Sequence, residues 1–243
     1  MCWKFPLSLH RLIAVAIFFS ASFSYQAAIA TTTDTVLYRA DFGAEPGLSI
    51  VNWLQKRQFE LQHDAEDEHK IRLSQTEESL HIVAQDSAFG LIIHEQDVLG
   101  AGRVKLHWGV SQYPEGASYE HGVDDEAIML YVFFGHEKFP SGSLFVPDSP
   151  YFLGFFLCKD GADELEKPYL GHHYRKAGRY ICVDHPGSNE TVVTEIDLAE
   201  EFRKSFGLAH VPAVSGISIE IDTTESENDG KAAAFVKRIE FLE

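Results

Sequence analysis

Three consecutive acidic residues, Asp124, Asp125 and Glu126, stand directly before an apolar run at 127–134. Carboxylates in this position could bind Ca²⁺ through their oxygens, accept hydrogen bonds from sugar hydroxyls, or act as acid and base in glycoside cleavage. Because successive side chains of a strand point to opposite faces, Asp124 and Asp125 would face one ligand only within a turn. The alternative is a solvated loop that leads into a buried strand.

A second candidate site is the segment "HHY" at 172–174, between two segments that carry cysteine. Histidine binds metals or transfers protons near neutral pH, but the spacing here is not that of a metal-binding pair. Tyrosines in loops could stack on sugar rings, while acids and histidines take the hydroxyls. These residue types predict one ligand-binding surface, made of Asp124, Asp125, Tyr119, His172, His173 and Tyr174.

A second acidic segment, "DTTESENDG" at 222–230, offers weaker ligands for a cation. Asp222, Glu225 and Asp229 could contribute oxygens to Ca²⁺, although their spacing does not match an EF-hand loop. A charged hairpin tip is the simpler alternative. We expect no other cofactor, and the chain has no G-x-S-x-G motif of a serine nucleophile.

The elements that would position these residues are mostly strands. Short β-branched and aromatic runs, interrupted by Gly, Pro, Asp and Asn, predict an all-β fold, an antiparallel β-sandwich of jelly-roll type. Two runs, 127–134 and 151–158, are apolar at both parities, which predicts inner strands covered on both faces. The expected strands lie at 35–42, 79–86, 89–96, 102–110, 127–135, 151–158, 178–185, 216–223 and 232–242.

One or two short helices complete the expected fold. Asp197 is a candidate N-cap and Gly207 a candidate end, with Leu198, Phe202 and Phe206 forming one apolar stripe between them. A second short helix is expected near 48–59. Trp108 is expected in the core rather than in a binding site.

The first thirty residues predict a secretory signal peptide. Lys4 and Arg11 flank the start of an apolar stretch, and Ala28 and Ala30 form an A-x-A cleavage pattern. A membrane anchor is the alternative, but the stretch is short for a membrane span. We therefore expect residues 1–30 to be removed, residues 31–243 to form a single domain without membrane insertion, and the protein to be periplasmic or secreted.

In such an oxidising compartment, Cys158 and Cys182 predict a disulfide between neighbouring antiparallel strands, with two buried thiols as the alternative.

The net charge of the chain limits the classes of binding partner. The chain has 20 Lys and Arg against 37 Asp and Glu, a formal net charge of −17, and loss of residues 1–30 would make it more negative. Nucleic acid is thereby disfavoured as a partner, because its affinity depends mainly on basic side chains.

Three segments resemble a known family: "VKLHWGVSQYP", "DDEAIMLYVFFG" and "FGLAHVPAVSGISIEIDTTE". Their order and spacing are similar to those of a bacterial secreted or periplasmic family catalogued as a domain of unknown function. The resemblance implies a jelly-roll-like β-sandwich similar to carbohydrate-binding modules, with no established reaction.

These features together predict an exported, non-catalytic β-sandwich protein that binds a carbohydrate or another cell-envelope component. One alternative is a polysaccharide hydrolase or lyase that uses a His or Tyr together with a carboxylate. Another is a structural protein of the cell envelope.

Overall fold

The computed structural model describes residues 1, 34–159, 165, 167–226 and 230–243. Residues Asp34–Glu243 form one compact unit. The predicted signal peptide lies, apart from Met1, outside the described residues. Among the described residues, none of the helices is long and apolar enough to cross a membrane.

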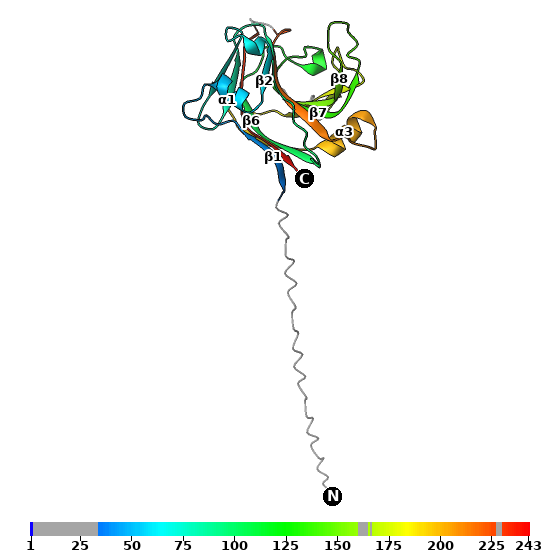
Figure 1. Ribbon diagram of the computed structural model, residues 1–243. Coiled ribbons are helices and arrows are strands. Elements are labelled where there is room, and N and C mark those ends of the chain that lie inside the picture. The colour runs from blue at the N-terminus through cyan, green and yellow to red at the C-terminus, as the bar shows by residue number, and fades with distance from the viewer. Residues whose placement is uncertain (2–33, 160–164, 166, 227–229) are drawn as a thin grey trace. The chain divides into compact units, whose positions relative to one another are not determined.

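The unit is a β-sandwich, so the predicted all-β fold is confirmed. Figure 1 shows its two layers, with β1 and β6 in one and β7 and β8 in the other. The first sheet has the order β11-β6-β13-β4-β3, and β1 also pairs with β13. Its strands are β1 (Val36–Asp41), β3 (Ile71–Gln75), β4 (Leu80–Ala84), β6 (Arg103–Gln112), β11 (Val192–Asp197) and β13 (Ala232–Leu242).

The second sheet has the order β2-β5-β12-β7-β8-β10-β9. It carries the candidate site on the face turned away from the first sheet. Its strands are β2 (Glu60–His63), β5 (Phe89–His94), β7 (Glu126–Phe139), β8 (Ser149–Leu157), β9 (Pro168–Tyr169), β10 (Gly178–Asp184) and β12 (Val214–Asp222).

Both predicted helices are present. Helix α3 (Leu198–Phe206) begins at Asp197, whose Oδ1 accepts a hydrogen bond of 2.8 Å from the backbone N–H of Glu200, and it ends at Gly207 with a φ of 68°. Its Phe202 packs on Phe134 with ring centroids 4.9 Å apart. Helix α1 (Ile50–Lys56) is the second, and two short 3₁₀ turns are η1 (Asp64–Glu66) and η2 (Tyr119–His121).

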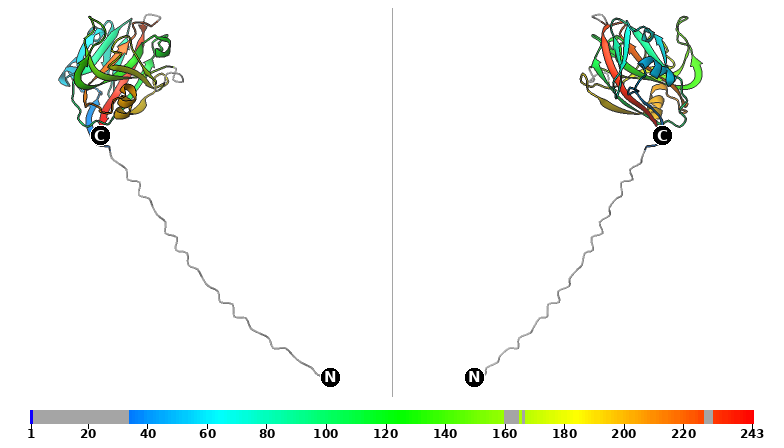
Figure 2. Two further views of the ribbon diagram at one scale, coloured as in Figure 1. Left: turned by 90° about the vertical axis from the view of Figure 1, so that its right-hand side faces the viewer. Right: turned by 60° about the vertical axis from the view of Figure 1, so that its left-hand side comes forward.

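The main core lies between the two sheets, and Trp108 is part of it, as predicted. Its indole Nε1 donates a hydrogen bond of 3.0 Å to Thr194 Oγ1, which satisfies the buried donor. Figure 2 shows from two further sides the red strand β13, which runs through the first sheet.

The apolar runs at 127–134 and 151–158 lie in β7 and β8, two inner strands that are buried on both faces over most of these runs, as predicted. Ile128, Leu130 and Val132 of β7 belong to the main core, but Met129 and Tyr131 belong to a separate cluster on the opposite face of the sheet. That second face forms the floor of an open cleft. Both parities are apolar because one face packs in the core and the other lines the cleft.

The predicted disulfide between Cys158 and Cys182 is present. The predicted strand direction was wrong, because β8 and β10 are parallel neighbours, with Ile181 opposite Phe155. Parallel neighbours need a long crossover rather than a hairpin. The connection over 158–177 supplies it and returns the chain to the end of the sheet where β8 begins.

Candidate functional site

A cleft of about 540 Å³ opens on the outer face of the second sheet. Its floor is mostly aromatic, with Tyr131 from β7, Phe152 from β8 and Tyr180 from β10. Strand β12 contributes the polar part of the floor through Ser218 and Glu220. Aromatic and polar side chains from four adjacent strands therefore face one ligand-sized space.

A β-bulge brings Glu126 to this face of the sheet. Glu220 of β12 pairs with Met129 of β7, but two residues further along β12, Asp222 pairs with Glu126, so β7 has one extra residue between the two pairs. Directly paired residues point to the same face. Without the extra residue, Glu126 would point into the core beside the isoleucines of β12. The bulge therefore re-aims its carboxyl towards Glu220.

Glu126 and Glu220 form a buried carboxyl pair, only 2% and 5% exposed. Burial raises the pKa of Glu126 well above its usual range, and the negative charges of Glu220 and Asp222 add to the effect. Burial also raises the pKa of Glu220, while hydrogen bonds from Glu126 and Tyr131 oppose the rise. Both shifts favour protonation of the pair at neutral pH.

Tyrosine hydroxyls support this pair. Tyr119 donates to Glu126 Oε2 at 2.7 Å, and Tyr131 donates to Glu220 Oε1 at 2.6 Å. Tyr180 hydrogen-bonds to Tyr131 behind them. Burial raises the pKa values of Tyr119 and Tyr131, so both remain protonated donors.

Two buried polar atoms of the floor have no hydrogen-bond acceptor or donor supplied by the described residues. One is Ser218 Oγ, in a side chain whose residue is 1% exposed, and the other is Glu126 Oε1. Ser218 lines the cleft, but its Oγ is almost fully covered by neighbouring atoms.

One end of the cleft is rich in carboxyl groups. Asp124, Asp222 and Glu225 line it. Burial raises the pKa of Asp222 to about 6, and Asp125 and Glu225 add to the rise while Thr224 opposes it. Burial likewise raises the pKa of Asp124, against the effect of His172. This end favours polar or positively charged ligand groups.

Five of the six predicted binding residues line the cleft: Tyr119, Asp124, His172, His173 and Tyr174. His172 Nε2 lies 3.9 Å from Asp124 Oδ2, which joins the two predicted segments. Asp125 instead holds the β12–β13 loop, accepting from the backbone N–H of Glu225 at 3.1 Å and from the hydroxyl of Ser226. Tyr119 is largely buried, and contacts the carboxyl pair rather than solvent. A binding function for these residues stays a prediction.

Glu220 was missed by the sequence reasoning. A signal was present, because Ser218, Glu220 and Asp222 alternate with three isoleucines and so place a polar row on one face of a strand. The position of Glu126 had no such signal, because it depends on the bulge.

The calcium prediction is also untested. Asp222 and Glu225 lie at the carboxyl-rich end of the cleft, whereas Asp229 lies outside the described residues. Within the described part of the chain, no three His, Cys, Asp or Glu side chains are grouped as metal ligands.

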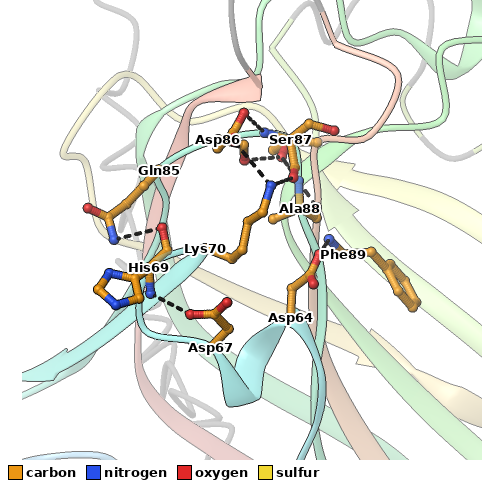
Figure 3. Close-up of polar contacts among 10 residues, drawn as sticks. Asp64, Asp67, His69, Lys70, Gln85, Asp86, Ser87, Ala88 and Phe89 are labelled. Atoms are coloured by element: carbon orange, nitrogen blue, oxygen red, sulfur yellow. Dashed lines mark hydrogen bonds and ion pairs between the residues drawn. The ribbon is translucent and has the colours of Figure 1, made fainter.

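The edge of the cleft at Phe89 is held by polar contacts among residues of the segments 64–70 and 85–89 (Figure 3). The backbone N–H of Phe89 donates to Asp64 Oδ2 at 3.0 Å. Lys70 Nζ contacts Asp86 Oδ2 at 3.0 Å and donates to the carbonyl of Ser87 at 3.1 Å. These contacts fix the start of β5, where Phe89 joins the lining.

No protein-family model and no curated protein sequence matches the chain. The solved structures that are weakly similar to it include the following three. A family 12 xyloglucanase from Bacillus licheniformis has a TM-score of 0.42 and 8% identity, covering 87% of this chain and 99% of its own. Endoglucanase 3 of Trichoderma harzianum, from family GH12, has a TM-score of 0.40 and 8% identity, covering 89% and 100%.

The third is an agarase, with a TM-score of 0.34 and 11% identity over 84% of this chain. The match covers 24% of the agarase, so the chain spans about a quarter of that protein's length.

Proposed function

We propose that the cleft binds a polysaccharide and that Glu126 and Glu220 hydrolyse a glycosidic bond in it. The observation that carries this proposal is a buried carboxyl pair beside an aromatic cleft, in which Glu220 lines the cleft and Glu126 is hydrogen-bonded to Glu220. It favours the hydrolase alternative over the non-catalytic binding protein that we expected from the sequence.

The lining of the cleft suits a sugar chain. Phe89, Phe133 and Tyr180, which are partly exposed, offer apolar ring surfaces for the C–H faces of pyranose rings. Asp124 and the histidines at 172–173 offer hydrogen-bonding groups for hydroxyls at the ring edges. An alternation of apolar and polar surface is what an amphipathic sugar ring requires.

The charge of the lining narrows the substrate class. The described lining residues include five carboxylic acids and neither lysine nor arginine. A polyanionic glycan would meet like charges in a site of low dielectric, which is unfavourable. We therefore expect a neutral glycan, or one with amino groups, as the substrate.

The pair can supply the two groups that glycoside hydrolysis needs, one acid and one carboxylate. Substrate would separate the two side chains so that they flank the scissile bond. The protonated group gives its proton to the leaving oxygen, which keeps the electrons of the broken C–O bond. The other carboxylate assists attack at the anomeric carbon, and water supplies the hydroxyl of the new reducing end.

The test is release of reducing ends from neutral polysaccharides, namely β-glucan, xylan, xyloglucan and agarose. We expect the wild-type protein to cleave at least one of them. Glu220→Gln and Glu126→Gln should each lower the rate by about 10² to 10⁴, the usual contribution of a general acid or base. Glu77→Gln is a matched control, because Glu77 is exposed on the other sheet, outside the cleft.

Binding without cleavage by the wild-type protein would instead support the non-catalytic reading. Binding is read from a rise in the unfolding midpoint on addition of each polysaccharide. Absence of both binding and cleavage across the four polysaccharides would contradict the proposal.

A further inference from the structure

The connection between β7 and β8 exposes two large apolar side chains at the edge of the cleft. Leu144 is 99% exposed and Phe145 is 95% exposed. Only Phe145 of the two lines the cleft, together with Val146 and Pro147 of the same connection. Two adjacent apolar side chains in water at the edge of a binding cleft point to contact with a ligand.

The base of this connection is tied to the cleft. Ser141 Oγ donates to the carbonyl of Val146 at 2.7 Å, which closes the loop. Tyr174 holds it from the neighbouring loop, because its hydroxyl donates to the carbonyl of Pro147 at 2.8 Å and its N–H donates to the carbonyl of Ser141 at 2.9 Å. Tyr174 in turn packs edge-on against Phe152 of the floor, with ring centroids 5.4 Å apart. Phe145 is therefore positioned by contacts that lead back to the cleft floor.

Polar groups suited to sugar hydroxyls lie along the same wall. Asp148 and His173 both line the cleft. Asp148 Oδ1 accepts a hydrogen bond of 3.3 Å from the backbone N–H of Ser141, which fixes it beside the loop. A flat apolar ring with acceptors near its edge is the arrangement that binds a pyranose by its C–H face and its hydroxyls together.

We propose that Phe145 is a stacking platform for a sugar residue at the outer end of the cleft, beyond the sugars that contact Glu220. This inference rests on the proposed function. The proposal distinguishes two possible ligands of the exposed loop at Leu144 and Phe145, a protein and a sugar chain. A protein partner would bury Leu144 and Phe145 as one apolar patch, whereas a sugar chain leaving the cleft would contact Phe145 alone. Because the platform lies at the rim, short glycans bound over the carboxyl pair would not reach it.

The experiment measures binding of cello-, xylo- and agaro-oligosaccharides of about two and about six units to the catalytically inactive Glu220→Gln protein by calorimetry. Adding Phe145→Ala should weaken binding of the longer oligosaccharide about tenfold, as expected when roughly half of a phenyl side chain loses its burial. Binding of the shorter one should not change. Leu144→Ala is the matched control, and should leave both affinities within about twofold. Phe145→Trp should keep the parent protein's affinity for the longer oligosaccharide.

Three other outcomes of this experiment would overturn the platform. Equal binding by the Phe145→Ala and parent proteins would overturn the platform and leave the proposed function intact. Equal losses in the Leu144→Ala and Phe145→Ala proteins would also overturn it, in favour of a general apolar patch. No binding of any oligosaccharide by the wild-type or Glu220→Gln protein would overturn the proposed function and the platform together. Both loop side chains are exposed, so unchanged unfolding midpoints are expected for both variants.

Discussion

Removing both carboxyl groups of the buried pair should change how stability depends on pH. The double variant Glu126→Gln and Glu220→Gln keeps the size of the side chains and leaves amide N–H groups that can replace the shared proton as donors. It removes the groups whose protonation differs between the folded and unfolded chain. The free energy of unfolding should then lose a pH dependence that the wild-type protein has.

The sign follows from the direction of the pKa shift. Burial first, and then the charges of Glu220 and Asp222, raise the pKa of Glu126 above its usual value of 4.5. Stability from this group is complete below that value and is lost as pH rises towards the folded-state pKa, because the unfolded chain releases a proton that the folded chain retains. The loss is about 1.4 kcal/mol per pH unit for one proton.

The interval from about pH 6.5 to pH 8 reports the protons held by Glu126 and Glu220 together. The pKa of Asp222 is raised only to about 6, so its own contribution has ended below this interval. Burial raises the pKa of Glu220 to about 8, so Glu220 also retains a proton over much of this interval. One retained proton over about 1.5 units amounts to roughly 2 kcal/mol, which is the smallest change expected for the pair. Wild-type stability should therefore fall by at least that amount relative to the double variant between the two pH values. Any packing cost of the substitutions cancels, because each protein is compared with itself.

The assay is reversible urea unfolding followed by tryptophan fluorescence at the two pH values. The native tryptophan signal reports the main core, where Trp53 and Trp108 are buried. Parallel stability curves for the two proteins over this interval would refute a proton shared by Glu126 and Glu220.

Three further predictions concern the scaffold of the cleft. Replacing Cys158 and Cys182 by serine should lower the free energy of unfolding by roughly 3–4 kcal/mol, the chain-entropy effect expected for a sequence separation of 24, measured by urea unfolding with and without reductant. Asp197→Ala should cost about 1 kcal/mol by removing the N-cap of α3, whereas Asp197→Asn should retain most of it; thermal unfolding of both variants checks this. Gly154→Ala should destabilise the fold by about 1–3 kcal/mol and weaken glycan binding. The reason is that a Cβ at this position would lie 2.5 Å from Met129 Sδ and 3.0 Å from the Tyr131 ring of the cleft floor. A calorimetric titration in which the variant binds glycan with wild-type affinity would contradict this prediction.

Features set by short-range sequence patterns could be predicted. Helix α3 was predicted from its N-cap Asp197, its apolar stripe and its terminal Gly207, all within eleven residues of sequence. The strands followed from β-branched and aromatic runs, and the disulfide followed from the two cysteines that remain after the expected removal of residues 1–30. These patterns depend on local geometry and on compartment, not on how distant strands pair.

Features set by strand pairing could not be predicted. The parallel direction of β8 and β10 depends on the path of the chain between Cys158 and Ala177, which composition does not specify. The position of Glu126 depends on one extra residue in β7, and strict alternation assigns its side chain to the wrong face. The candidate site therefore emerged only partly from sequence: His172 and Asp124 were found and Glu126 was named in the acidic cluster, but its partner Glu220 was missed.

The position of β13 has a consequence for the order of folding. Every other element precedes it in the chain, yet it pairs with β6 along its length and with β4 and β1 on its other side. During synthesis from the N-terminus, the first sheet cannot assemble until residues 232–242 have been made, and β1 must wait for a partner about two hundred residues away, as in the pairing of Arg39 with Glu240. Such non-local pairing slows folding and leaves strand edges exposed in the meantime. A nascent chain of this protein therefore lacks the central strand of its first sheet until residues 232–242 have been made.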